Sequence, residues 1–418
     1  MAKITKVKGR QVFDSRGNPT VEAEVFLDND ISATAISPSG ASTGAFEAYE
    51  LRDQDKNNFL GKSVNLAIEN ITKKIGLTLI GLNPTDQSKI DKVLIDLDGS
   101  ENKKNLGANA ILAVSLACAK SAALSLKQPL YKNLGKSFSL PIPLMNIING
   151  GAHADNDLNI QEFMIRPDSA KNFIDSIEKC YLVIQNLKGL LKSKKMLTNV
   201  GDEGGFAPSI NTNEEAFELI VNAIEKSKLT PGKDIVICLD VAANELLNEK
   251  GQYSIQSSSF NSVDDVIKYY KKITSQYPIK SIEDPFAEDD WKAWEKITSE
   301  IGNNVQIVGD DLFVTNSKRL EKGINNRSAN SILIKPNQIG TLSETLEVIS
   351  KAKKANFSTI ISHRSGDTED TFIADLAVAT ESSQIKTGSL ARSERVAKYN
   401  RLLRIEEELG NQVKMAKI

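Results

Sequence analysis

The stretch SILIKPNQIG, residues 331–340, combines the pattern of a buried β-strand with a charge at its end. The four residues before Lys335 are mostly apolar and β-branched, which is typical of a strand in a parallel sheet. Pro336 prevents the strand from continuing because proline has no backbone N–H to donate. Lys335 is therefore either a surface cation or a buried amine with a chemical role.

The same pattern recurs along the second half of the chain, where short apolar runs end in a polar or charged residue. Successive ends lie roughly 23 to 43 residues apart, which is about what a strand with a returning helix needs. The runs are IVICLD with Asp240, IKSIED with Glu283, VQIVGD with Asp310, SILIK with Lys335, STIISHRS with His363 and Arg364, and QIKTG with Lys386. With earlier strands from IQEFMIRP and PLMNII, the pattern predicts a parallel β/α barrel.

The ends of such strands meet at one mouth of the barrel, where catalytic groups collect. Asp240, Glu283 and Asp310 would repel one another there, and a hard divalent cation such as Mg²⁺ would relieve that repulsion. The alternative is that each carboxylate caps the helix that follows its strand.

The two lysines at the mouth have two interpretations. A lysine beside a metal and a second cation has a lowered pKa, so that Lys335 or Lys386 could act as a neutral base. The alternative is that each forms a salt bridge with the acidic cluster. Arg364 and Ser365 suit a phosphate or carboxylate clamp, and a stacked structural arginine is the other possibility.

Two acidic residues and a histidine lie earlier in the chain. Glu162 follows Gln161 in a predicted strand, whereas Glu203 lies in the glycine-dense loop NVGDEGGFAP. His153 lies in another glycine-rich loop, INGGAHAD. Flexible backbone around the adjacent acids Asp202 and Glu203 often marks a mobile active-site segment, although a plain turn is the commoner explanation of DEGG.

The N-terminal part of the chain has a different organisation. Residues 3–26 alternate apolar and polar side chains around DSRGNP, which predicts a hairpin. A Gly/Ser loop and then helical stretches follow, and FSLPIPLMNIING reads as a junction. We predict an α+β domain at residues 1–136 and a barrel domain at residues 137–418.

Composition excludes several classes of function for this chain. The chain has 418 residues, a net charge of −2 and no basic block, which argues against direct nucleic-acid or anionic-membrane binding. Three scattered cysteines suit a reducing cytoplasm and form no zinc motif. The start lacks the apolar region of a signal peptide, and residues 108–126 read as a packed helix rather than a membrane span.

Several motifs carry a resemblance to a known family. They are DSRGNPTVE, PSGASTG, QEFMI, VGDEGGFAP, SIEDPF, VGDDLFVTN, KPNQIGT, SHRSGDTEDTFIADLAV and ARSERVAKYNRLLRIEEELG, from residue 14 to residue 410. In this order they resemble the enolases, the phosphopyruvate hydratases of glycolysis. The resemblance implies an α/β fold: a modified (β/α)8 TIM-type barrel, ββαα(βα)6, with a smaller α+β N-terminal domain.

The resemblance also implies a cofactor and roles for individual residues. Asp240, Glu283 and Asp310 match the ligands of the first of two Mg²⁺ ions, and Ser42 matches the loop ligand of the second. Lys335 matches the general base and Glu203 the general acid, supported by Glu162. The positions that match substrate-binding residues are His153, Gln161, Glu162, Glu283, Asp310, His363, Arg364, Ser365 and Lys386.

The implied reaction is the reversible dehydration of 2-phosphoglycerate to phosphoenolpyruvate, by a cytoplasmic homo-oligomer that is a dimer or an octamer. Ser37 and the residues around His153 depart from the family pattern, which affects loop closure more than chemistry. Another superfamily dehydratase or cycloisomerase is the alternative enzyme, but IVICLDVAANE lacks paired lysines. A binding role in an RNA-degradation assembly, or at the cell surface from a secondary exported pool, would be an addition to catalysis.

Overall fold

The computed structural model describes residues 2–40, 44–154, 156–255, 258–260, 262–410 and 413–418. The N-terminal unit contains an antiparallel sheet whose strands are ordered β1 (Ile4–Phe13), β2 (Pro19–Leu27) and β3 (Ser32–Ile36). The β1–β2 turn is held by Asp14, whose Oδ1 accepts hydrogen bonds from the backbone N–H groups of Arg16 and Asn18. The predicted hairpin is therefore present.

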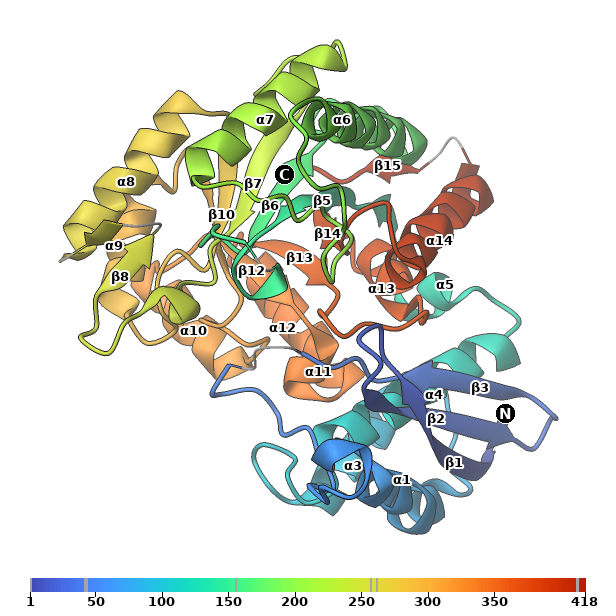
Figure 1. Cartoon of the computed structure of the whole chain (residues 1–418). Helices are drawn as coiled ribbons and strands as arrows, with labels where there is room; N and C mark the ends of the chain where they lie inside the picture. The colour runs from blue at the N-terminus through green and yellow to red at the C-terminus, as the bar shows by residue number, and fades with distance from the viewer. Residues whose placement is uncertain (1, 41–43, 155, 256–257, 261, 411–412) are drawn as a thin grey trace.

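Helices cover one face of this sheet (Figure 1). The segment from α1 (Asn65–Asn70) through a π-helical turn (Ile71–Ile75) into α2 (Gly76–Leu79) contacts β1, and α4 (Ala108–Ser125) contacts β2 and β3. The helices α3 (Gln87–Asp98) and α5 (Leu130–Leu134) pack against α4. Among the described residues, α4 is the one helix long and apolar enough to cross a membrane, and 83% of its 18-residue window is buried inside the protein. It packs on β2 and β3, so its apolar surface serves the core of the N-terminal unit.

The rest of the chain forms a closed eight-stranded barrel with the predicted ββαα(βα)6 order. The strands, in order around the barrel, are β5 (Ile142–Asn149), β6 (Glu162–Arg166), β7 (Val236–Asp240), β10 (Ile279–Glu283), β11 (Gln306–Gly309), β12 (Ser331–Ile334), β13 (Ser358–Ser362) and β14 (Gln384–Lys386). Two helices, α6 (Phe173–Ser193) and α7 (Asn213–Lys226), separate β6 from β7. The fold class predicted from the sequence is confirmed.

Helices also follow each of the last six barrel strands. They are α8 (Val263–Gln276), α9 (Trp291–Ile301), α10 (Ser317–Asn326), α12 (Leu342–Lys354) after the short α11 (Pro336–Ile339), α13 (Phe372–Ala379) and α14 (Ser393–Leu409). Short elements complete the barrel unit: β4 (Ser139–Leu140) pairs with β15 (Lys414–Met415), and β8 (Tyr253–Ile255) pairs with β9 (Ser258–Phe260).

Helix capping in the barrel uses side chains other than the acidic strand ends. The helices α8, α9 and α10 begin after Ser262, Asp290 and Asn316, and each of these side chains accepts a backbone N–H of its own helix. Asp240, Glu283 and Asp310 therefore do not cap these helices, and the alternative that capping explains them is wrong.

Strand β6 runs antiparallel to both of its neighbours, β5 and β7. Its first residue, Glu162, therefore pairs with Asp240, the last residue of β7. Because β6 is reversed, the start of this strand lies at the same mouth as the ends of the parallel strands. Glu162 reaches that mouth for this reason.

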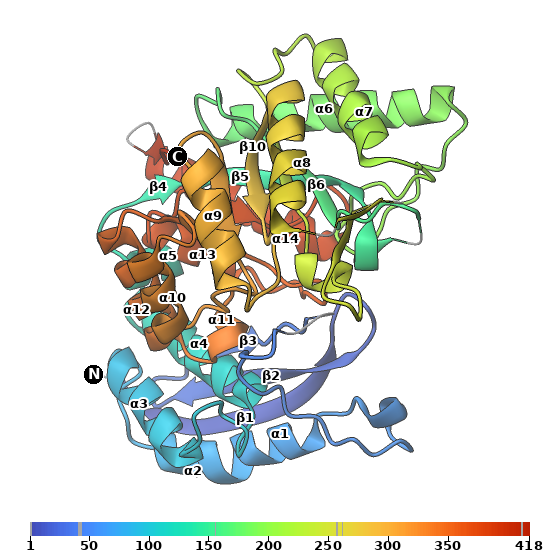
Figure 2. The same ribbon diagram turned by 90° about the vertical axis from the view of Figure 1, so that its left-hand side faces the viewer.

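The barrel interior is packed below the mouth. Apolar side chains fill it, namely Leu144, Met164, Val236, Cys238, Val308, Leu333 and Ile360. The N-terminal unit lies beside the mouth in both views (Figures 1 and 2), where Ser39 pairs with Gly366 and Ala48 donates its backbone N–H to Gln338. The mouth is therefore enclosed by barrel loops and by the N-terminal unit together.

Candidate active site

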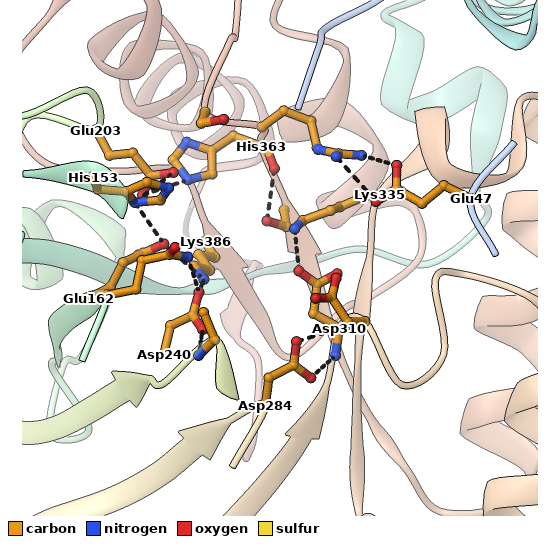
Figure 3. Close-up of a pocket in the computed structure, with 16 residues that line it drawn as sticks. Glu47, His153, Glu162, Glu203, Asp240, Asp284, Asp310, Lys335, His363 and Lys386 are labelled. Carbon is orange, nitrogen blue, oxygen red and sulfur yellow. Dashed lines mark hydrogen bonds and ion pairs between the residues drawn. The ribbon is translucent and has the colours of Figure 1, made fainter. Parts of the chain in front are cut away.

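A cavity opens at the mouth of the barrel (Figure 3). Its lining is almost entirely polar and includes eleven residues that the sequence singled out: His153, Gln161, Glu162, Glu203, Asp240, Asp310, Lys335, His363, Arg364, Ser365 and Lys386. Glu283 lies behind Lys386, which it contacts, and Ser42 lies outside the described residues. Strand ends and loops from distant parts of the chain thus meet at one place.

Lys386, the last residue of β14, lies among three carboxylates. Its Nζ is 2.9 Å from Asp240 Oδ2, 2.9 Å from Glu283 Oε1 and 3.2 Å from Glu162 Oε1. Burial alone would lower the pKa of this lysine, but the charges of Asp240, Glu162 and Glu283 raise it well above its usual value. Lys386 is therefore a fixed cation.

Lys335 directly follows β12 and forms an ion pair with Asp310. Its backbone N–H also donates to Thr315 Oγ1 at 2.9 Å, which fixes the start of the side chain. Burial acts to lower the pKa of Lys335, but the charges of Asp310 and Glu283 contribute to a pKa that is raised above its usual value. The salt-bridge alternative thus describes the contacts of both lysines in the structure. The lowered pKa is the expectation for a lysine beside a bound metal.

The acidic residues divide into two groups. Asp240 and Glu283 are joined through Lys386, whereas the carboxylate oxygens of Asp310, Asp284 and Asp311 lie within 4.8 Å of one another. Asp284 also accepts the backbone N–H groups of Asp310 and Asp311, both at 2.9 Å, and so positions them.

These carboxylates carry more negative charge than the nearby cations balance. Burial and the charge of Asp240 raise the pKa of Glu283 well above its usual value, and burial with Asp310 raises that of Asp311 to about 7. Buried hard oxygen donors with surplus negative charge are the environment that a divalent cation such as Mg²⁺ prefers. The donor set therefore fits a divalent metal.

The opposite side of the cavity holds two histidines and two glutamates. His153 Nδ1 lies 3.8 Å from both Glu162 Oε1 and Glu203 Oε1, and His363 Nε2 lies 3.4 Å from Glu203 Oε2. Burial and the charge of Glu203 raise the pKa of Glu162. Burial would also raise the pKa of Glu203, but His363 and His153 lower it below its usual value. A proton shared by the two carboxylates therefore resides on Glu162.

Arg364 already holds a carboxylate in the structure. Its Nη1 and Nη2 donate to Glu47 of the N-terminal unit at 2.9 Å and 3.2 Å. This two-point contact is the geometry that a guanidinium uses for carboxylate and phosphate groups.

Some functional neighbours were missed in the sequence. Gln338 donates to Asp310 Oδ1 at 2.9 Å and accepts from Thr315 Oγ1 at 2.8 Å, and Asn146 donates to Glu203 Oε2 at 3.3 Å. The position of Gln338, one helical turn after Lys335, was a usable signal. Glu47 and Asn146 gave none, because their partners lie far away in the chain.

Gly205 gives a test of how tightly the Glu203 loop is held. A Cβ at Gly205 would lie 2.2 Å from Asn149 Oδ1 and 2.9 Å from Asn146 Oδ1, so Gly205→Ala must displace the loop or both asparagines. We expect kcat to fall at least about tenfold, because small misplacements of catalytic groups have large kinetic effects.

The matched control is Gly189→Ala in α6, where the added Cβ would meet nothing within 4 Å. It should leave kcat unchanged and raise the free energy of unfolding by about 0.5–1 kcal/mol, because alanine favours a helix interior over glycine. Steady-state kinetics and denaturant unfolding measure both variants. Equal kcat values for the two would show that the Glu203 loop tolerates displacement.

Comparisons with known proteins agree with this architecture. Residues 4–134 match the family model described as the enolase N-terminal domain, and residues 137–418 match that of the enolase C-terminal TIM barrel domain. The enolase of Pelagibacter ubique (strain HTCC1062) is 63% identical over 420 residues, which covers 100% of both chains. The two family models together span nearly the whole sequence. The chain belongs to the enolase family.

Proposed function

We propose that this enolase interconverts 2-phosphoglycerate and phosphoenolpyruvate with Lys335 as the base and Glu203 as the acid, in glycolysis and, in reverse, in gluconeogenesis. The observation that carries the proposal is that the proposed base and the proposed acid enter the cavity from different elements. Lys335 enters it from the end of β12, whereas Glu203 enters from the loop that packs against β5 (Figure 3). A substrate between them would present its two reacting carbons to two different side chains.

The proton to be removed lies beside a carboxylate that is already negative, so its removal builds a second charge on the same oxygens. Lys335 accepts the C2 proton, and the buried cation Lys386 offsets the growing charge. Glu162 holds the proton that the two carboxylates share and passes it to Glu203. Glu203 then donates it to the departing C3 hydroxyl. Arg364 and Ser365 bind the phosphate, and His153, Gln161 and His363 complete the substrate contacts.

The proposed cofactor is two Mg²⁺ ions per active site. Asp240, Glu283 and Asp310 would hold the first, and Ser42 would contribute to the second. Cations held there would supply positive charge to the substrate carboxylate, and their charge near Lys335 would favour its neutral amine. The excess of buried carboxylates described above supports this proposal.

The function is tested by following the ultraviolet absorbance of the enol phosphate product after 2-phosphoglycerate is added. We expect turnover with Mg²⁺, complete loss after excess EDTA, and recovery when Mg²⁺ is restored. Circular dichroism in EDTA is the control that the fold persists. Turnover that continues in EDTA would contradict the metal requirement, and folded protein inactive with Mg²⁺ would contradict the substrate.

A further inference from the structure

Arg395, in the first turn of α14, is fully buried between three loops of the active site. Its Nη1 donates to the carbonyl of Arg364 at 2.6 Å. Its Nη2 donates to the carbonyls of Ser365 at 2.7 Å and Asp202 at 3.1 Å, and to Ser15 Oγ of a third loop at 3.4 Å. The closest carboxylate oxygens, on Glu394 and Asp367, are 3.4 Å and 3.7 Å away. The short hydrogen bonds of this buried cation to the backbone therefore go to loop carbonyls rather than to a carboxylate.

Arg395 also contacts the imidazole of His363. Its Nη1 lies 2.6 Å from His363 Nδ1. Arginine nitrogens can only donate hydrogen bonds, so His363 Nδ1 must be the acceptor and carry no proton. In a neutral imidazole the proton then resides on Nε2, which lies 3.4 Å from Glu203 Oε2.

We propose that Arg395 is a positioning residue that fixes His363 as the neutral Nε2–H tautomer, so that the Nε2–H group faces Glu203 Oε2. The consequence for catalysis rests on the proposed role of Glu203 as the acid. Arg395 also ties the carbonyl of Asp202, beside Glu203, to that of Ser365, beside the proposed phosphate clamp. The Arg395 guanidinium thereby determines which imidazole nitrogen carries the proton, and it also fixes the distance between the two loops.

The charges around His363 agree with a neutral ring. Burial lowers the pKa of His363 to about 4; Glu203 raises it, Arg395 lowers it further, and Asp367 on the following loop raises it. Asp367 is itself paired with the fully buried Lys398, at 3.1 Å from Nζ to Oδ1. His363 therefore stays uncharged at neutral pH.

The chain contains only two histidines, His153 and His363, which makes the tautomer directly measurable. We would label the untagged full-length protein with ¹⁵N-histidine and record long-range ¹H–¹⁵N spectra, with His153→Gln to assign the signals. His363 should show a protonated Nε2 and an unprotonated Nδ1 throughout about pH 5 to 8. A protonated Nδ1 in the wild type would overturn the proposal without any variant.

The variants are Arg395→Lys, which keeps the charge but loses the fork, and Arg395→Met, which loses both. We expect His363 to become a mixture of tautomers, and kcat to fall at least about tenfold with KM within about threefold, because Arg395 does not line the cavity. The matched control is Arg166→Lys: Arg166 is also buried but bonds to Gln306 and Gln384 at the far end of the barrel. Arg166→Lys should change neither the His363 tautomer nor the kinetic constants.

An Arg395→Met protein that loses activity but keeps the wild-type tautomer would show that Arg395 only supports the loops, and the proposal would fail. If Arg395→Met does not fold, the tautomer in the wild-type spectrum and the measurements on Arg395→Lys still test the proposal. The tautomer is read without turnover, so its result is independent of the proposed function. Failure of the Glu203 assignment would appear instead as an active Glu203→Gln enzyme with an unchanged His363 spectrum.

Discussion

Replacing Lys335 with arginine is expected to lower kcat by about two to four orders of magnitude while leaving the fold intact. Arginine keeps the positive charge that faces Asp310, but it does not deprotonate in proteins and cannot accept the C2 proton. Lys335→Ala should lose as much activity, because it removes the base as well. If Lys335 acts as a base, both variants lose activity. If it only pairs with Asp310, Lys335→Arg should keep activity.

The measurement is single-turnover and steady-state kinetics, together with exchange of the C2 proton of 2-phosphoglycerate for deuterium in D₂O. Neither variant should catalyse this exchange. The matched control is Lys103→Arg, a buried lysine paired with Glu344 at 3.0 Å outside the cavity, which should keep near wild-type kinetics. A loss of less than about tenfold in Lys335→Arg, under about 1.4 kcal/mol of barrier, would overturn the assignment.

Replacing Glu203 with glutamine is expected to lower kcat for dehydration by about two to four orders of magnitude, with C2 proton exchange preserved. The amide nearly matches the carboxyl in size and can keep a hydrogen bond with Asn146, but it cannot donate a proton to the departing hydroxyl. Lys335 and its surroundings are unchanged in this variant, so the first chemical step should continue.

Nuclear magnetic resonance of the substrate in D₂O, followed beside product absorbance, separates the two steps. The matched control is Asp202→Asn in the same loop, because the Asp202 side chain does not line the cavity and Arg395 contacts only its carbonyl. Loss of both exchange and dehydration in Glu203→Gln would mean that Glu203 acts before or during C2 proton removal, against its assignment as the acid.

The sequence by itself determined the barrel and the identity of most cavity residues. Apolar runs that end in Asp240, Glu283, Asp310, Lys335 and Lys386 are local signals, because strand propensity, proline and strand length are encoded within a few residues. The rule that parallel strands end at one mouth then brought these side chains together without any coordinates. The resemblance to the enolases added expected roles for individual residues, which the spacing of the strand ends left open.

The tertiary structure alone decided how these groups are paired. Reversal of β6 brings Glu162 to the mouth, and Lys386 joins Asp240 to Glu283, residues that are far apart in the chain. The position of Arg395 against His363 likewise follows from packing α14 beneath three loops. Electrostatic and hydrogen-bond partners depend on distances of a few ångströms between separate elements, and only the packed barrel fixes those distances.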